Sequence, residues 1–389
     1  MREVLIYAAG ERLGILMDNQ VRQLSSQYYK KYKKNISDIQ MKRAWKTQGE
    51  GARFMGAYNP MDQNPDDAQA EVNSLAFAGD GEQFYYSIAV EGYSGIFLKN
   101  SLDDSEPEGH VIHNSGVRFF GLDFCPAKKK LVTSVSEGSI ERHLAIFNTG
   151  RAVYQLLTEG ESLDDNPSWA KTHANALYYD TCGIGLGKNG GPVDFSYRTI
   201  NLLDLATGEI HEVIAQDKKD CIKPREDEQG NLYFIRRPRE LGKNRTFGFK
   251  SILLAPVLLV KALFNWVNFF TLRYTGQTMT QGGPNPAKGK EANPEEIFIE
   301  GNLINARKTL KENQAAGESS PGIVPKSWEL VKRTPSGDLV LMAKGVLDYD
   351  LDQGGIVYSN GKYLIRVSSD GHQGRLGEVS LVSHLRVRT

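Results

Sequence analysis

The stretch DDNPSWAKTHANALYYDTC, residues 164–182, decides the fold. It has a strand-like start, a tight polar turn and a second strand rich in aromatic and apolar residues, which is the pattern of a β-hairpin. Similar hairpin patterns recur at residues 72–89, 121–136, 221–237 and 346–361. The chain is therefore predicted to be a series of related β units.

The spacing of the units predicts how they assemble. Phe77, Phe124, Trp169 and Arg225 hold comparable places in four of them and lie 47, 45 and 56 residues apart. A period near 45 residues with two to four strands per unit is typical of propeller blades. An ordinary β-sandwich also repeats hairpins, but five hairpins in one phase exceed what a sandwich of about 100–150 residues needs. We expect an all-β protein with a single β-propeller.

Three segments carry a family resemblance. DNPSWAKTHANALYY, residues 165–179, resembles the D-x-x-P-x-W-S-P-D-G-x-x-I-x-Y repeat of TolB-type (PD40, WD40-like) propellers, and LAFAGDGEQFYYS, residues 75–87, is similar to the same repeat. INLLDLATGEIHEVI, residues 200–214, looks like the outer hairpin of that family's blades. The resemblance covers about residues 71–240 and 346–380. It implies the fold, and a bracing role for Asp165 at a blade turn, but it does not imply a function.

The two ends of the chain indicate how the ring closes. Residues 4–24 parallel residues 355–367, and both look like strands two and three of a blade. The first blade then lacks an innermost strand, which LVSHLRV, Leu381–Val387, can supply. This closure gives one domain over residues 1–389 with six blades, or seven as the alternative. Residues 25–70 hold a basic run that is either a helix or an extra partial blade.

An insertion of residues 241–295 interrupts the fifth unit. It begins with the apolar stretch SILLAPVLLVKALFNWVNFFTL, residues 251–272, and continues as a loose loop rich in glycine and proline. A single membrane crossing would place the two halves of one blade on opposite sides of the bilayer, and 22 residues are too few for two crossings. Lys261, Asn265 and Asn268 share one helical stripe. We therefore expect a hydrophobic amphipathic helix and not a transmembrane span.

This helix has three possible places: the membrane interface, a partner or second copy of the chain, or the surface of its own propeller. The side chains expected to make the contact are Leu258, Leu259, Leu263, Phe264, Trp266, Val267, Phe269 and Phe270. A basic collar flanks them and would be attracted to an anionic cytoplasmic leaflet. Its members are Arg236, Arg237, Arg239, Lys243, Arg245, Lys250 and Arg273. The basic run with Lys30, Lys31, Lys33 and Lys34 can add to the same surface.

The chain offers little that points to chemistry. GIGLGKNGG, residues 183–191, lacks the Ser or Thr that follows the lysine of a phosphate-binding loop, and a glycine-rich hairpin is the better interpretation. No Gly-x-Ser-x-Gly elbow occurs, the seven histidines are scattered, and the three cysteines form no close pair. We therefore expect no catalytic residue, no metal and no cofactor.

The amino-acid composition and the N-terminal sequence limit the kinds of partner and location expected for the chain. The 389 residues carry 47 basic and 47 acidic side chains, which argues against a dedicated nucleic-acid binder. The N-terminus lacks the form of a secretory signal, so a cytoplasmic protein is expected.

The resulting hypothesis is a non-catalytic scaffold for protein interaction, peripherally attached to a membrane or a membrane-protein partner through the inserted helix. A propeller enzyme of the lactonase or hydrolase kind, with its site at the mouth of the central channel, is the alternative. A structural subunit of a larger assembly is a third, and the inserted helix could also join two copies of the chain.

Overall fold

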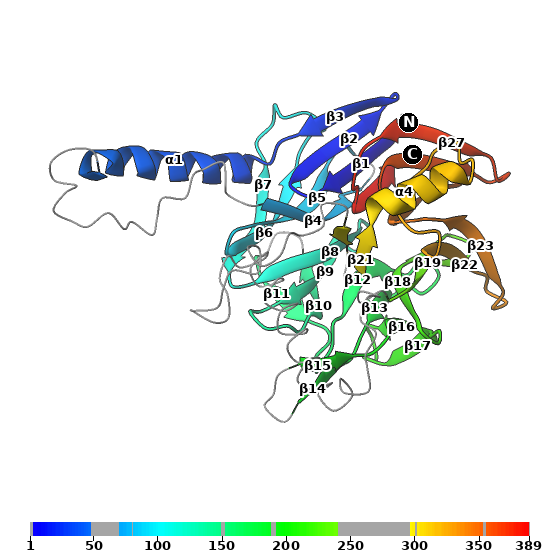
Figure 1. The fold of residues 1–389 in the computed structure, drawn as a ribbon. Helices are drawn as coiled ribbons and strands as arrows, with labels where there is room; N and C mark the ends of the chain where they lie inside the picture. Colours follow the sequence, from blue (N-terminus) through cyan, green and yellow to red (C-terminus); the bar gives the residue numbers. More distant parts are fainter. Residues whose placement is uncertain are drawn as a thin grey trace, which may run out of the picture.

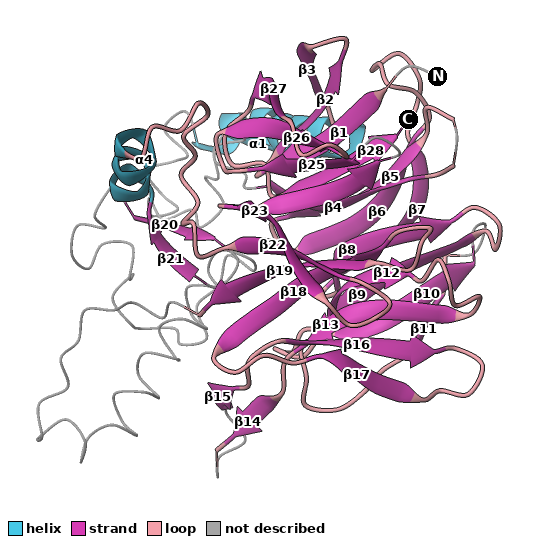
Figure 2. Cartoon of the chain, turned by 90° about the vertical axis from the view of Figure 1, so that its right-hand side faces the viewer, coloured by secondary structure: helices cyan, strands magenta, loops and turns pink. Residues whose placement is uncertain are grey.

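A computed structural model of the chain describes residues 3–47, 70–79, 81–148, 152–187, 192–239, 296–299, 302–352 and 355–388. Six four-stranded antiparallel sheets stand around a common axis (Figures 1 and 2). The six-bladed propeller predicted from the repeats is thus confirmed.

The blades follow one another along the chain. Blade 1 contains β28 (His384–Arg388), β1 (Val4–Ala9), β2 (Arg12–Met17) and β3 (Gln20–Leu24). Blade 2 contains β4 (Ala70–Phe77), β5 (Phe84–Val90), β6 (Tyr93–Lys99) and β7 (Gly109–Ser115). Blade 3 contains β8 (Arg118–Cys125), β9 (Lys130–Ser136), β10 (His143–Asn148) and β11 (Tyr154–Leu156). In each blade the first strand named is the innermost.

The second half of the ring repeats this order. Blade 4 contains β12 (Asp165–Trp169), β13 (Ala176–Thr181), β16 (Thr199–Asp204) and β17 (Ile210–Ile214). Blade 5 contains β18 (Lys219–Glu226), β19 (Leu232–Pro238), β22 (Glu329–Arg333) and β23 (Leu339–Lys344). Blade 6 contains β24 (Asp348–Asp352), β25 (Gly355–Ser359), β26 (Tyr363–Ser368) and β27 (Gln373–Glu378).

Blade 1 is assembled from both ends of the chain. Strand β28 pairs with β1 in antiparallel register from Val4 opposite Arg388 to Ala8 opposite His384. The innermost strand therefore starts at His384, three residues after the Leu381 start expected from sequence, and ends at Arg388. Because β28 covers the inner edge of β1, that edge is not left open to pair with another chain.

Apolar side chains join each blade to the next. Buried clusters lie between blades 1 and 2, 2 and 3, 4 and 5, 5 and 6, and 6 and 1, and two smaller clusters lie between blades 3 and 4. In the last contact to close, Leu5 of β1 and Leu385 of β28 pack with Val357 and Leu364 of blade 6. The core is thus a ring of contacts between blades, and no blade buries its faces alone.

The inner strands of blades 2 to 5 share an irregularity. Their pairing shifts register between Val72 and Ser74, Phe120 and Leu122, Asp165 and Ser168, and Ile222 and Arg225. Such a β-bulge re-aims the side chains beside it. At three of the bulges Gly121, Asn166 and Lys223 have positive φ values of 35°, 50° and 56°. These three residues also line the central opening described below.

Blade 5 contains a long segment between its second and third strands, and this segment extends past residue 295, where the sequence predicted that the blade strands resume. The sequence between its neighbouring strands β19 and β22 contains the hairpin of β20 (Glu296–Ile299) and β21 (Asn302–Asn305) and the helix α4 (Ala306–Ala315). The Asn305 side chain caps α4 by accepting a 2.8 Å hydrogen bond from the Lys308 N–H. The predicted amphipathic helix at 251–272, like the rest of 241–295, lies outside the described residues. Within the described part of the chain, no helix is long and apolar enough to cross a membrane.

The basic run after blade 1 is a helix and not a partial blade. Helix α1 (Gln27–Thr47) runs away from the propeller, as Figure 1 shows in blue. A second small hairpin, β14 (Ile184–Leu186) with β15 (Pro192–Phe195), contains the glycine-rich stretch. That stretch therefore joins two strands, as the sequence indicated.

Replacing a buried residue of the closing strand should weaken the whole ring. Leu385 is fully buried, so we expect Leu385→Ala to lower the free energy of unfolding by about 2–5 kcal/mol. Leu341→Ala is the control, because Leu341 on the outermost strand β23 is 46% exposed and its loss should change stability by less than about 0.5 kcal/mol. Urea unfolding followed by circular dichroism measures both, and equal effects would contradict the closure of the ring through β28.

Candidate functional site

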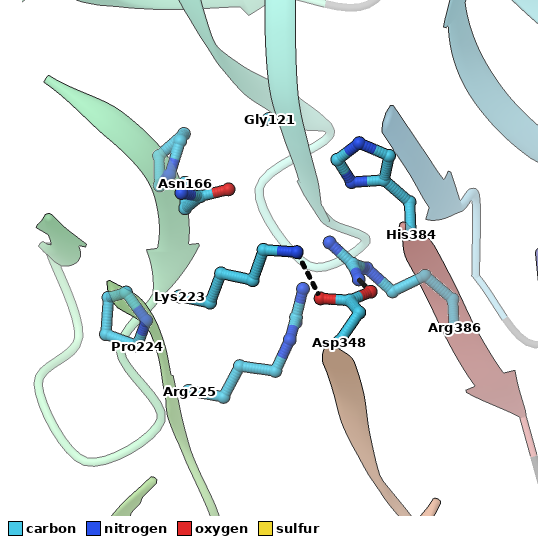
Figure 3. A pocket seen from close by; sticks show the side chains of 9 residues that line it. Gly121, Asn166, Lys223, Pro224, Arg225, Asp348, His384 and Arg386 are labelled. Atoms are coloured by element: carbon cyan, nitrogen blue, oxygen red, sulfur yellow. Dashed lines mark ion pairs between the residues drawn. The ribbon is translucent and has the colours of Figure 1, made fainter. Parts of the chain in front are cut away.

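The inner strands of blades 3 to 6 and the closing strand β28 surround a small opening at the axis. It encloses about 280 Å³ of empty space, including the part open to solvent. Its lining residues are Gly121, Asn166, Pro167, Lys223, Pro224, Arg225, Asp348, His384 and Arg386. Figure 3 shows Lys223, Arg225 and Arg386 converging on the carboxylate of Asp348.

Lys223 connects blade 5 to blade 6 and to the end of the chain. Its Nζ lies 2.9 Å from Asp348 Oδ1, and both side chains are buried. The same nitrogen donates to the carbonyl oxygen of Ser383 at 2.9 Å. The carbonyl oxygen of Lys223 accepts a 2.7 Å hydrogen bond from the Tyr349 hydroxyl. A charge buried in this way needs both an ion partner and hydrogen bonds, and Lys223 has both.

Carboxylates near the axis hold the neighbouring inner strands. Asp348 Oδ2 accepts the N–H of Leu385 at 2.7 Å, and Asp350 Oδ2 accepts the N–H of Val387 at 2.8 Å. Asp123 Oδ2 does the same for the N–H of Trp169 at 2.7 Å. These acids satisfy backbone donors that would otherwise be buried without a partner at the inner edge of a sheet. Their position in the fold is therefore explained by structural bonds.

A second buried ionic cluster lies beside the opening, between blades 3, 4 and 5. Asp165 accepts two hydrogen bonds from Arg142 Nη1, at 3.0 and 2.9 Å, and one from Arg198 Nη2 at 2.9 Å. Asp180 contacts Arg198 Nη1 and accepts the Asn166 amide at 2.8 Å and the Lys223 N–H at 2.9 Å. Asp165 therefore bridges two arginines that precede strands of different blades, β10 and β16, which is a larger role than the bracing of one turn that the resemblance implied.

The two carboxyl groups of this cluster have opposite pKa shifts. Burial raises the pKa of Asp180 to about 6, against the pull of Arg198, and the nearby Asp165 adds to the rise. Burial also works to raise the pKa of Asp165, but Arg142 and Arg198 together outweigh it and hold that pKa below its ordinary value. Asp165 is thus the group that stays ionised in the folded protein at moderately acidic pH.

Helix α1 is fixed to the propeller at its first turn. Glu108 Oε1 accepts the N–H of Gln27 at 3.0 Å, and Ser26 Oγ accepts the N–H of Tyr29 at 3.1 Å. Asp104 accepts the N–H of Ser25 at 3.1 Å. The buried Lys99 Nζ lies between the two acids, 2.7 Å from Asp104 and 3.3 Å from Glu108. Carboxylates at a helix N-terminus satisfy its free donors and complement its dipole.

Aromatic packing continues this attachment along the start of the helix. Tyr28 stacks on Phe97 of β6 with ring centroids 4.7 Å apart. Tyr28, Tyr29 and Tyr32 all pack against the apolar cluster between blades 1 and 2. Beyond them the helix carries exposed side chains, including Ile39 and Met41, and extends from the body of the molecule (Figure 1). The first turns are therefore docked and the remainder projects.

The residues expected to attach the protein to a membrane or partner are only partly described. Lys243, Arg245, Lys250, Arg273 and the eight apolar side chains from Leu258 to Phe270 lie outside the described residues. Arg236 Nη2 lies 2.8 Å from Glu329, Arg237 is buried and stacks 4.3 Å from the Trp328 ring centre, and Arg239 Nη2 lies 2.6 Å from Asp220. These three arginines of the collar have partners within the propeller, and the attachment itself stays a prediction.

Two of the histidines lie beside each other on one strand. His110 and His113 share strand β7, with Nε2 of the first 3.0 Å from Nδ1 of the second. In the described ranges no group of three His, Cys, Asp or Glu residues is placed to hold a metal ion.

The sequence analysis did not identify the residues of the central opening. Lys223, Asp348, His384 and Arg386 come from three blades, and none belongs to a recognisable motif. One signal was available: Asn166-Pro167 and Lys223-Pro224 are equivalent dipeptides, and both sit at a bulge of an inner strand. Proline inside a strand is characteristic of bulges and edges, so this pair could have marked residues turned toward the axis.

Comparisons with known proteins support the fold. No family model matches the sequence, and no curated protein matches it. Among solved structures, a nidogen/laminin complex aligns with a TM-score of 0.51 and 7% identity over 100% of this chain and 98% of that one. TolB from Acinetobacter baumannii aligns with a TM-score of 0.48 and 11% identity over the whole chain, which spans 65% of that TolB. The predicted likeness to TolB-type propellers is confirmed at the level of the fold.

An enzyme is also among the similar structures. The tricorn protease aligns with a TM-score of 0.38 and 11% identity, and this chain spans 34% of its length. A likeness at this identity and TM-score does not transfer an activity.

The lowered pKa of Asp165 predicts a pH-dependent stability. Because the folded-state pKa lies below the unfolded value of about 4, the stabilisation is complete above pH 4 and is lost as the pH falls through the folded-state pKa. We expect Asp165→Asn to lower the free energy of unfolding by about 3–5 kcal/mol at pH 7, because it removes the buried carboxylate that Arg142 and Arg198 share and leaves Arg198 with Asp180 alone. The difference from the unmodified protein should shrink below pH 4. Urea titrations at several pH values measure it.

Asp217→Asn is the matched control for this prediction. The Asp217 side chain is 87% exposed, so its removal should change stability little at any pH. A gap between Asp165→Asn and the unmodified protein that stays constant from pH 7 to pH 3 would contradict the ionic role of Asp165.

Loss of the cap should loosen α1. Glu108→Ala removes the acceptor for the Gln27 N–H and leaves Lys99 with one carboxylate, so the first turn should open more often. A helix cap contributes about 1–2 kcal/mol, which corresponds to exchange of the amides of residues 27–32 that is about 5–30 times faster. Hydrogen exchange with mass spectrometry measures this. Glu106→Ala, at an exposed neighbouring acid, should leave the rates unchanged, and equal rates in both variants would argue against the cap.

Proposed function

We propose that this chain is a non-catalytic propeller scaffold for protein interaction, held at the cytoplasmic face of a membrane by peripheral attachment. The observation that carries the proposal is helix α1, a basic arm fixed to the rim of the propeller at one end and projecting from it at the other. The inserted segment 251–272 supplies the apolar part of the attachment, on the strength of its sequence.

Helix α1 carries a large excess of positive charge. Its 21 residues include seven lysines and arginines and one acid, Asp38, in a chain whose basic and acidic residues are equal in number. Lys30, Lys31 and Lys34 are exposed. An anionic lipid surface attracts each close basic residue with about 1 kcal/mol. A projecting helix can bring several of them to such a surface together, because only its first turns are docked.

The acids near the axis favour a scaffold over an enzyme. Asp348, Asp350 and Asp123 each give an oxygen to a backbone N–H of the neighbouring blade. A catalytic carboxylate needs an oxygen directed at its substrate, and these are already committed to holding the ring. The nidogen/laminin structure is a protein complex, which agrees with a binding role for propellers of this kind.

Vesicle flotation tests the attachment. We expect the protein to float with vesicles of phosphatidylcholine and 30 mol% phosphatidylserine and not with phosphatidylcholine alone. Lys30→Gln/Lys31→Gln/Lys34→Gln should weaken binding on the order of 100-fold, because three charges contribute about 1 kcal/mol each. The control is Lys171→Gln/Lys218→Gln/Lys308→Gln, three lysines whose side chains are 50%, 80% and 72% exposed elsewhere on the propeller.

A second pair of substitutions separates the two parts of the attachment. Leu259→Glu/Phe264→Glu should also reduce binding to the vesicles that contain phosphatidylserine, because it removes apolar contact and not positive charge. If the unmodified protein stays in solution as a monomer with both vesicle types, the attachment is wrong. Turnover of an ester or lactone that Asp348→Asn abolishes would favour the enzyme, and stable co-purification with a fixed set of proteins would favour a subunit of an assembly.

A further inference from the structure

The central opening contains more hydrogen-bond donors than acceptors. Arg386 has five guanidinium N–H groups; its Nη1 donates to the carbonyl oxygen of Leu385 at 2.6 Å and lies 4.0 Å from Asp348 Oδ2. Its Nε is buried and has no hydrogen-bond partner in the described part of the chain. Asp348 cannot turn toward it, because Lys223 Nζ holds one of its oxygens and the Leu385 N–H holds the other. Arg386 is thus a buried cation with unused donors.

A second guanidinium shares the opening. Arg225 Nε lies 3.3 Å from Asp350 Oδ1, while the other oxygen of Asp350 accepts the Val387 N–H. Figure 3 shows the ends of the Arg225 and Arg386 side chains approaching the same space beside Asp348. Burial lowers the pKa of Arg386, and so does the charge of Arg225, although Asp350, Asp348 and Asp123 act in the opposite direction. An anion placed between them would relieve the repulsion and use the free donors.

We infer that the central opening binds a carboxylate, held by the guanidiniums of Arg225 and Arg386 with His384 beside it. A carboxylate presents two oxygens in one plane, which matches the paired N–H groups of a guanidinium and gives the stronger, charge-assisted hydrogen bonds. All three side chains line the opening.

The surroundings favour a group with a single negative charge. Asp348, Asp350 and Asp123 lie close enough to act on the two arginines, so a dianion such as phosphate would be repelled more than a monoanion. The opening is small and partly open to solvent, so only the carboxylate group of a ligand can enter it, and the rest of the ligand must lie outside. The ligand is therefore either a free small carboxylic acid or the C-terminal carboxylate of a peptide.

Titrations of the full-length protein without lipid distinguish these sources. The probes are sodium acetate, tetra-alanine with a free C-terminus, and the same peptide with a C-terminal amide, followed by calorimetry and by the Nε–Hε resonances of arginine. We expect the free acid to bind at least tenfold more tightly than the amide and to move the Arg386 Nε–Hε resonance. Binding of acetate as well indicates a small-acid site, and binding of the peptide acid alone indicates a peptide terminus.

Variants test the assignment to these arginines. Arg386→Gln and Arg225→Lys should each weaken binding of the acid tenfold or more, whereas Arg375→Gln, at a 46% exposed arginine on β27, should leave it within twofold. The inference is overturned if neither acid binds, if the amide or inorganic phosphate binds as tightly as the acid, or if both opening variants bind like the unmodified protein. If Arg386→Gln does not fold, two results decide the outcome: the difference between the free and the amidated peptide, and the affinity of Arg225→Lys. These titrations contain no lipid. A failure of carboxylate binding therefore does not contradict the proposed membrane attachment, and a failure of the attachment does not contradict carboxylate binding.

Discussion

The rest of the structure depends on hydrogen bonds that cross from one blade to the inner strand of the next. The inner edges of six sheets meet at the axis, where their backbone N–H groups are buried and cannot pair with a further strand. Ser74 Oγ accepts the N–H of Leu122, and Asp180 accepts the N–H of Lys223. Asp348 accepts the N–H of Leu385 in the same way. Hydrogen bonds to a charged acceptor contribute about 1.5–3 kcal/mol each, so these side chains set the spacing of the blades.

The same bonds create the chemistry of the opening. Buried carboxylates are stabilised by nearby cations. Here the cations are Lys223, Arg225 and Arg386. Because each acid also gives an oxygen to the backbone, the Nε of Arg386 is left without a hydrogen-bond partner in the described part of the chain. A surplus of donors is a consequence of how the ring is held together, and a carboxylate ligand would complete the network.

The two candidate binding regions are independent in the fold. The opening is lined by blades 3 to 6 and the closing strand, whereas α1 docks at the contact between blades 1 and 2. A ligand at the axis and a surface bound by α1 can therefore be present together. This arrangement suits a scaffold, in which one face of the molecule is attached while another recognises a partner.

Much of the fold could be predicted from short stretches of sequence. Hairpin patterns and their period near 45 residues gave the blades, because turn residues and strand alternation act over a few neighbours. The start of the closing strand was placed three residues early, since its ends depend on pairing with β1 at the far end of the chain. The central opening was not predicted at all, because no local pattern distinguishes Asp348 or Arg386 from a surface charge.

The sequence by itself determined the repeated strands, their assembly as a propeller and the basic character of residues 30–46, since these rest on composition and on contacts between near neighbours. Only the tertiary structure decided which charges are buried together. Lys223 meets Asp348 across 125 positions of the chain, and the Leu385 N–H meets the same carboxylate only because the last strand returns to the first blade. The physical reason is that burial and ion pairing depend on distance in space, which the ring sets when it closes.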